Sequence, residues 1–185
     1  MLRIKNFYIR GKIMYIKILG SLLIILSGSF LGFLGSLKFS FRVRELNELI
    51  QALEFMKVEV GINKLLPHIF EDLSNRENFK IAIIFKNVLK HLREDSYIDL
   101  ENAWKFGLWD SMKVGYLKKE DLEIVENLAI MLQKSNLEGQ IRNINYLIEK
   151  LKGQEKQAVL SKVKNERLFR VGGLLSSVAL VIILF

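Results

Sequence analysis

Cysteine is absent from this chain of 185 residues, and proline occurs only once. Without cysteine the protein cannot hold a disulfide framework, a zinc finger or an iron–sulfur cluster, and it has no thiol nucleophile. With its one proline at position 67, long stretches of the chain contain no residue that breaks a helix. Acidic residues are also missing from both ends, because all 20 of them lie between Lys38 and Arg170. Negative charge is therefore confined to the middle of the chain.

Positive charge is distributed differently. Residues 1–17 hold five of the 28 basic residues, and the middle holds the other 23 together with all 20 acidic residues, so its net charge is 23 minus 20, or +3. A middle so close to neutral disfavours a nucleic-acid-binding surface, and we predict no nucleic-acid partner; a soluble helical nucleic-acid binder is the least favoured class. The basic start, next to an apolar segment, is typical of charge that sets topology or contacts anionic lipid.

The first apolar segment runs over residues 18–37, where 20 consecutive residues are uncharged. As a helix it spans about 30 Å, the thickness of the hydrocarbon core of a bilayer. A cleaved signal peptide is the alternative, because residues 27–29 read Ser-Gly-Ser at a spacing suited to cleavage. The apolar run continues past that point and is longer than most signal-peptide apolar regions. We therefore predict a transmembrane helix over 18–37, after a basic segment over 1–17.

The second apolar segment runs over residues 171–185, which contain no charged residue and as a helix extend about 22 Å. Leu168 and Phe169 lengthen it if the side chain of Arg170 reaches back to the membrane surface. A buried core helix is the alternative, but these residues offer no polar face. We predict a second transmembrane helix here.

Small residues recur at four-residue spacing in both segments, which lets helix backbones approach closely in lipid. Ordinary glycine content of membrane helices is the alternative explanation. The candidates for helix packing are Gly28, Gly32, Gly172, Gly173, Ser176 and Ser177.

The two spans predict a hairpin, with residues 38–170 on one side of a membrane and both termini on the other. Basic residues flank this middle segment at both ends, which places it in the cytoplasm by the positive-inside rule. The five basic residues before Ile18 favour the opposite orientation. Translation from Met14 would leave only Lys17 there, and we take this as a hypothesis.

The middle segment is predicted to be helical throughout, because its apolar residues recur at helical spacing and no strand-like alternation persists. The first of these helices continues out of the first span and is expected to end at Gly61, since glycine commonly follows a helix end. The last runs from 138 to 185, with Gly153 as a possible break. The fold class is therefore all-α, a bundle of five to six helices between an N-terminal and a C-terminal transmembrane helix. The predicted helices of the middle cover 43–60, 65–73, 81–92, 100–108, 122–132 and the start of 138–185.

Residues that could carry chemistry are sparse. His68 and His91 lie on different predicted helices, without a metal-binding motif around either. The sequence contains no phosphate-binding GxxxxGK[ST] loop and no G-x-S-x-G nucleophile motif. Adjacent acids such as Glu120 and Asp121 project about 100° apart on a helix and do not form a two-carboxylate site. We predict a protein that is not an enzyme, with no cofactor, metal or small-molecule substrate.

Several motifs together resemble the stage III sporulation protein AB family over residues 14–185. The most specific is LKKEDLEIVENLAIMLQKSN at 117–136, although Gln133 and Asn136 stand where family members commonly carry a Leu-Gly pair and an Asp. The other matching pieces are Met14, Lys17 and Gly20 opening the first span, Arg42 and Glu59, GINKLLPHIFEDLS at 61–74, Ala103-Trp104, and Gln140 in the long last helix.

The resemblance implies more than the residues do. Family members belong to endospore-forming bacteria and to an engulfment-stage assembly that joins mother cell and forespore across two membranes. Their soluble domain is similar to the cytoplasmic domain of the type II secretion platform protein F. The implied partners are stage III sporulation protein AA, a secretion-type ATPase, and other membrane proteins of the channel. The implied location is the mother-cell side, in the outer forespore membrane.

These implications lead to a functional hypothesis, a non-enzymatic membrane scaffold that couples the ATPase to the channel. Exposed charges near the membrane are candidate docking residues, namely Arg42, Arg44 and Glu59; plain solvated surface is the alternative for them. A pore-lining channel or transporter subunit is the second hypothesis. It is disfavoured because neither span contains an ionisable residue, which conducting segments often need.

Overall fold

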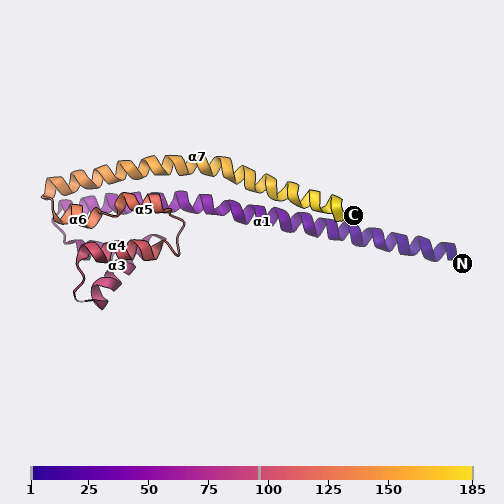
Figure 1. The fold of residues 1–185 in the computed structure, drawn as a ribbon, viewed down its shortest axis with the longest axis horizontal. Helices are drawn as coiled ribbons and strands as arrows, with labels where there is room; N and C mark the ends of the chain where they lie inside the picture. The colour runs from indigo at the N-terminus through magenta and orange to yellow at the C-terminus, as the bar shows by residue number, and fades with distance from the viewer. Residues whose placement is uncertain (1, 96, 185) are drawn as a thin grey trace. The chain divides into compact units, whose positions relative to one another are not determined.

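The structure is a computed structural model that describes the backbone of residues 2–95 and 97–184 and the side chains of residues 15, 17–95 and 97–184. Every regular element in these residues is an α-helix (Figure 1), which confirms the predicted all-α class. The helices are α1 (Leu2–Gly61), α2 (Leu66–Ser74), α3 (Ala82–Glu94), α4 (Leu100–Ser111), α5 (Lys119–Val125), α6 (Leu128–Gln133) and α7 (Leu137–Leu184).

The chain divides into two compact units. Residues 40–160 form one unit, here called the core domain. Residues 1–39 and 161–185 form the other, here called the apolar pair, so α1 and α7 each contribute residues to both units. The sequence analysis placed the boundaries at 37/38 and 170/171.

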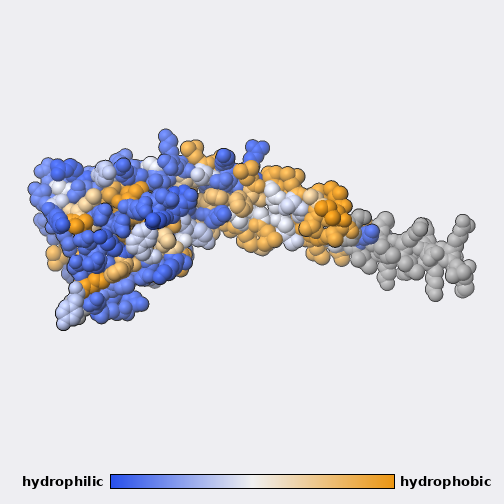
Figure 2. Space-filling model, in the orientation of Figure 1, coloured by the Kyte–Doolittle hydropathy of each residue, from blue (hydrophilic) through white to orange (hydrophobic). Residues whose placement is uncertain are grey.

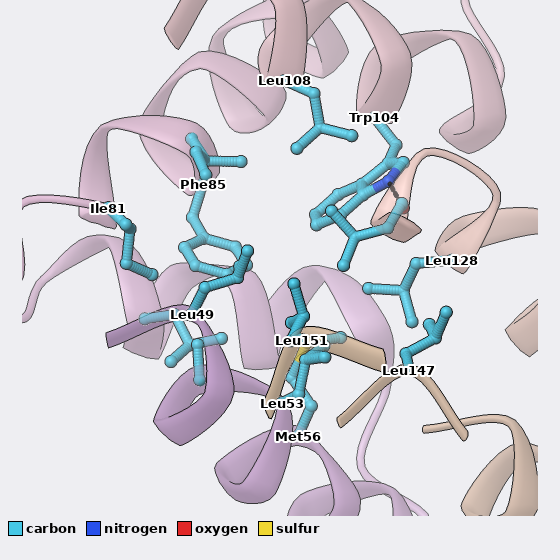
Figure 3. Close-up of a cluster of buried hydrophobic side chains, with 14 of the residues drawn as sticks. Leu49, Leu53, Met56, Ile81, Phe85, Trp104, Leu108, Leu128, Leu147 and Leu151 are labelled. Atoms are coloured by element: carbon cyan, nitrogen blue, oxygen red, sulfur yellow. Dashed lines mark hydrogen bonds between the residues drawn. The ribbon is translucent and has the colours of Figure 1, made fainter. Parts of the chain in front are cut away.

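The core domain is built around aromatic side chains contributed by α2, α3 and α4. The Trp104 ring centroid lies 5.4 Å from that of Phe70 and 6.0 Å from that of Phe85, and all three side chains are fully buried. Figure 1 shows α3 and α4 as one layer of this domain, with α5 and α6 between that layer and α7. Leucines of α1, α6 and α7 close the core around Trp104 (Figure 3). Each such side chain contributes about 1.5–3 kcal/mol when fully buried.

The end of α1 differs in detail from the prediction. The helix does end in this region, but Gly61 is still helical and the left-handed residue is Asn63, with φ of 60°. The Asn63 amide donates to the Val60 carbonyl at 2.8 Å, and the Lys64 amide donates to the Glu59 carbonyl at 3.0 Å. This pair of bonds is the Schellman pattern, in which asparagine can replace glycine at the left-handed position. The expected role of Gly61 is therefore filled by Asn63.

The single helix predicted over 122–132 is two helices, α5 and α6, and this prediction was wrong. The indole Nε1 of Trp104 donates a hydrogen bond of 2.8 Å to the Val125 carbonyl oxygen, at the last residue of α5. In a continuous helix that carbonyl would accept from the amide four residues later. The buried indole takes this acceptor, so the chain turns at Glu126 and Asn127 before helix resumes.

The remaining predicted helices are confirmed. Pro67 lies in the first turn of α2, where its missing amide hydrogen costs no bond. α7 continues through Gly153 without a break, and a Cβ added at Gly153 would meet no atom within 4 Å.

Candidate functional site

The apolar pair directs most of its large apolar side chains outward. Leu22, Leu26 and Phe30 on α1 are 53–61% exposed, and Leu175 and Ile183 on α7 are 61% and 84% exposed. Figure 2 shows hydrophobic residues, in orange, gathered over this pair of helices on the face in view. Large apolar side chains that point outward from two neighbouring helices are compatible with contact with a membrane or with another protein. Both helices are long and apolar enough to cross a bilayer, which is compatible with membrane association.

Glycines bring the two helices of the apolar pair into backbone contact. A Cβ added at Gly32 would lie 2.6 Å from the Phe169 carbonyl oxygen and 3.1 Å from the Gly173 Cα. A Cβ added at Gly173 would lie 2.7 Å from the Gly28 carbonyl oxygen, and one at Gly28 would lie 2.6 Å from the Ser177 Cβ. Any side chain at these positions would separate the helices, so the contact depends on glycine.

The structure thus brings together four of the six candidate packing residues. Gly172 has no atom within 4 Å of an added Cβ, and Ser176 is exposed, so these two face away from the contact. The buried Ser177 hydroxyl donates to the Leu174 carbonyl at 2.7 Å, and the buried Ser36 hydroxyl donates to the Phe33 carbonyl at 2.7 Å. Each hydroxyl is therefore satisfied within its own helix, as an apolar surrounding requires.

Cations and aromatic rings meet at one end of the apolar pair. The Lys38 Nζ lies 4.8 Å from the Phe169 ring centroid, and the Arg170 guanidinium carbon lies 5.5 Å from the Phe33 ring centroid. The rings of Phe39 and Phe169 are 5.7 Å apart. Cation–aromatic contacts let the charged heads stay near apolar surface at lower cost. This is the level at which the sequence analysis placed the membrane boundary.

In the core domain, charged side chains of α1 hold two loops and the first turn of α5. Arg42 and Asp121 form a two-point ion pair, with Nε–Oδ2 of 2.9 Å and Nη2–Oδ1 of 2.8 Å. Glu45 Oε2 accepts from the amides of Tyr116 and Leu117 at 2.6 Å and 3.0 Å. Burial raises the pKa of the Glu45 carboxyl above its ordinary value, and these two amide bonds partly oppose that shift.

Glu48 repeats the arrangement one turn further along α1. Its Oε2 accepts from the Lys80 and Ile81 amides at 2.6 Å and 3.2 Å, at the start of α3. Its Oε1 lies 2.8 Å from Arg44 Nε, and Arg44 also donates to the Asn78 carbonyl at 3.1 Å. Buried acids therefore satisfy loop amides that would otherwise lack partners.

The three predicted docking residues have internal partners. Arg42 was expected to be exposed, and that expectation is wrong, because its side chain is only 12% exposed and is paired with Asp121. The expected exposure of Glu59 is wrong as well, because its side chain is 16% exposed and lies 2.8 Å from Lys64. Arg44 is 54% exposed but bonded to Glu48. A docking role for them stays a prediction. Arg42 and Glu45 share a helix face with Leu46 and Leu49. A charged residue on an otherwise apolar helix face indicates that its side chain packs inside the domain, and this was the signal available in the sequence.

Each of the two histidines lies beside one acidic side chain. Among the described side chains, no three histidines or acids lie together as metal ligands would. His91 pairs with Asp110 at 3.0 Å, and Lys113 also bonds Asp110 at 2.9 Å. Both bonds lower the pKa of Asp110 below its ordinary value, and the bond from Lys113 has the larger effect. The arrangement fits a surface ion-pair cluster.

Fold and surfaces together define an all-α protein in which a packed helical domain is joined to a pair of helices with outward apolar side chains. The family model described as Stage III sporulation protein AB matches residues 17–185, and this chain belongs to that family. The resemblance seen in the sequence is thereby confirmed, and a sporulation role follows for the family.

Two known proteins are similar to the chain. It is 22% identical over 173 residues to stage III sporulation protein AB of Bacillus subtilis (strain 168), covering 91% of this chain and 99% of that protein. A solved structure of stage III sporulation protein AB (SpoIIIAB) matches with 18% identity and a TM-score of 0.61, covering 67% of this chain and 98% of that one. This second likeness supports the fold.

The pieces that carried the sequence resemblance meet in space at two places. Arg42 and the LKKEDLEI segment are joined by the ion pair to Asp121, across 79 residues of chain. Glu59 and the GINK segment are joined by the bond to Lys64. In this structure both contacts hold parts of the core domain together.

Proposed function

We propose that this chain is a non-enzymatic, two-pass membrane scaffold of the sporulating cell. It holds the core domain at the cytoplasmic face of the mother-cell side, in the outer forespore membrane. There it couples a stage III sporulation protein AA-type ATPase to the other membrane proteins of the channel between mother cell and forespore. Family membership supports the sporulation context, and the glycine-mediated contact between two outward-apolar helices is the single observation that carries the membrane role.

Two anchors suit a scaffold better than one. At each of its ends, at residues 39/40 and 160/161, the core domain continues into a helix of the apolar pair. Restricting the orientation of a domain raises its effective concentration toward partners in the same membrane. Arg42, Glu45 and Glu48 of the domain bond to groups inside it, and the described side chains include no metal-ligand cluster. These features favour holding a partner over catalysis.

Charge supports the cytoplasmic orientation of the core domain. Lys38, Arg42 and Arg44 follow the first apolar segment, and Lys164, Arg167 and Arg170 are among the basic residues before the second. Positive residues near the ends of membrane helices are retained on the cytoplasmic side. Protease added to sealed vesicles of known orientation should therefore cut within 40–160 only from the cytoplasmic face.

Membrane insertion is tested first, by fractionating cells that express the full chain. We expect the protein to stay in the membrane pellet through high-salt and alkaline carbonate washes and to be released only by detergent. Release without detergent would overturn the membrane role and the scaffold with it.

Coupling is tested by capture from sporulating cells. The full chain, tagged and solubilised in mild detergent, should retain an AA-type ATPase. The matched control keeps residues 1–39 and 161–185 but carries an unrelated helical domain between them, and it should retain none. Equal retention by both baits, or by neither, contradicts coupling through the core domain. Ion conductance of the purified chain in liposomes would instead favour a pore.

A further inference from the structure

Two cations in the α7 part of the apolar pair lack a partner. Lys164 and Arg167 are exposed, and among the described side chains neither has an ion-pair or hydrogen-bond partner. Their neighbour Arg170 is engaged, because it lies 3.7 Å from Glu166 and over the ring of Phe33. Solvation alone would account for an isolated surface cation. The surroundings of Lys164 and Arg167 therefore decide whether they have a further role.

Acidic side chains are nearly absent from these surroundings. Glu166 is the only acid in residues 1–39 and 161–185, and the next acid along α7 is Glu155, about 13 Å before Lys164. On a helix, Glu166 projects about 200° away from Lys164 and 100° away from Arg167, whereas the two cations project within about 60° of each other. The face of α7 that carries the two cations is therefore positive.

Apolar side chains continue the same face. A hollow of about 480 Å³, here called the α7 groove, is lined by Val163, Lys164, Arg167, Leu168 and Val171. Its three apolar residues are 46–68% exposed. Leu168 also lines a second apolar hollow, of about 320 Å³, together with Phe169 and three glycines of the apolar pair. Two cations thus stand at the edge of an open apolar surface.

The α7 groove crosses the level at which charge ends on the helix. Val171 begins the uncharged run to 185, and Arg167 and Lys164 precede it by about 6 Å and 10 Å along the axis. The polar headgroup zone of a bilayer is roughly 5–8 Å thick on each side, and long basic side chains reach along a helix toward it. All these residues belong to one unbroken helix within one unit, so α7 alone fixes their order.

We propose that the α7 groove binds one anionic phospholipid of the surrounding bilayer; the proposal rests on the membrane role proposed above. The phosphate lies between Lys164 and Arg167, and an acyl chain follows Leu168 and Val171. A guanidinium can bond two phosphate oxygens at once, and an ammonium group adds a point charge. Charge complementarity selects a lipid over another apolar helix, which would strip water from both cations without supplying a counter-charge. The bound lipid holds α7 at a fixed depth.

Quenching from the acyl chain of one lipid species tests the site. The chain has no cysteine, so the full chain carrying Leu175→Cys takes a single bimane fluorophore. Leu175 is 61% exposed and follows Val171 by about one turn. Vesicles contain equal amounts of phosphatidylglycerol and phosphatidylcholine, and only one of the two is brominated on its acyl chains. Brominated phosphatidylglycerol should quench severalfold more than brominated phosphatidylcholine, an effect that free phosphate cannot produce. Equal quenching overturns the proposal.

Two double variants locate the binding site. Lys164→Gln with Arg167→Gln should lower the preference for phosphatidylglycerol by about fivefold for each cation removed. Lys156→Gln with Lys162→Gln removes the same charge from α7 outside the groove, and this matched control should retain the preference. An equal loss in both double variants would mean diffuse attraction and would overturn the site.

A second probe position separates this proposal from the membrane role itself. Ile183 is 84% exposed near the other end of the uncharged run, and a probe at Ile183→Cys should be quenched equally by either brominated lipid. If it is, and the probe at 175 shows no preference, only the lipid site is wrong. If neither lipid quenches either probe, the membrane role is wrong as well. A preference at 183 as large as that at 175 also overturns the site.

Discussion

Arg42 illustrates how the setting of one charged residue decides its role. Its guanidinium is bonded twice to Asp121, whose side chain is fully buried, and Asp121 also accepts from the Lys118 amide at 2.8 Å. The pair joins α1 to the first turn of α5. Desolvation of two charges offsets much of their attraction, so the pair adds little net stability, while loss of one partner leaves a buried charge alone.

Replacing Arg42 by methionine should therefore lower the free energy of unfolding by about 3–5 kcal/mol. The double variant Arg42→Met with Asp121→Asn should lose less, because the asparagine is neutral and can still accept from the Lys118 amide. The control Lys90→Ala removes a pair whose side chains are 64% and 63% exposed, and should cost under about 1 kcal/mol. Urea unfolding in micelles, followed by tryptophan fluorescence, measures all three. A double variant less stable than Arg42→Met would contradict this account.

Glu45 predicts a pH dependence with a defined sign. Burial raises the pKa of its carboxyl above 4.5, with a smaller contribution from nearby Glu48. The folded domain therefore binds the Glu45 proton more tightly than the unfolded chain does. This contribution to stability is fully present below about pH 4.5 and is lost as pH rises through the raised pKa.

The variant Glu45→Gln should not lose stability as pH rises through this range, because it has no carboxyl group to ionise. Its amide oxygen can still accept from the loop amides. The difference in free energy of unfolding, wild type minus variant, should fall as pH rises from 4.5 toward neutrality. Taking this difference removes the opposite contribution of Asp110, whose lowered pKa adds stability that is lost only as pH falls below 3.8. A difference that is constant or rises with pH would show that burial does not govern Glu45.

At the scale of elements, close helix contacts depend on individual glycines. In the core domain, a Cβ added at Gly107 on α4 would lie 2.4 Å from the Val88 Cγ2 and 2.8 Å from the Val88 amide nitrogen on α3. Gly153 on α7 has open space around it instead. The two positions form a natural comparison between a contact glycine and a helix-surface glycine.

Gly107→Ala should reduce the free energy of unfolding by about 1–3 kcal/mol, because the methyl group forces α3 and α4 apart. Gly153→Ala should increase it by up to about 1 kcal/mol, because alanine is the better helix former. Urea titration of both variants in the same micelles gives the two signs. Effects of the same sign would contradict the packing described for α3 and α4.

The apolar pair offers the corresponding comparison between Gly32 and Gly172. Gly32→Val should separate α1 from α7, because the added side chain meets the Phe169 carbonyl, whereas Gly172→Val faces open space. Spin labels on cysteines at Leu23 and Ile182, which are 60% and 75% exposed, report the distance between the helices. We expect a longer and broader distance distribution for Gly32→Val alone. An equal change in both variants would mean that the glycine contact does not hold the pair.

On the scale of the whole molecule, the division into two units predicts an independent core domain. Its buried residues all come from 40–160, and a core of this size is sufficient for a stable domain. A fragment of residues 40–160 should be soluble and helical by circular dichroism, and should unfold cooperatively with the loss of blue-shifted Trp104 emission. A fragment that binds hydrophobic dye and unfolds without cooperativity would show that the domain depends on the apolar pair.

Much of the fold could be predicted from sequence because helical periodicity is local. Pro67 and the apolar spacing located α2, and the proline-free run from 138 predicted α7 within one residue at its start. The break between α5 and α6 could not be read in this way. It depends on a hydrogen bond from Trp104, which lies 21 residues earlier in the chain.

The sequence by itself determined the all-α class, the two uncharged apolar segments and the family. Each of these follows from composition, from local spacing of residues or from contiguous motifs. Tertiary structure alone decided that Arg42 pairs with the buried Asp121, that Glu45 and Glu48 hold loops, and that Gly173 rather than Gly172 meets Gly32. The physical reason is that desolvation and close contact depend on which distant residues become neighbours. Local spacing places a side chain on a face of a helix, but only the packed chain supplies the partner that the face meets.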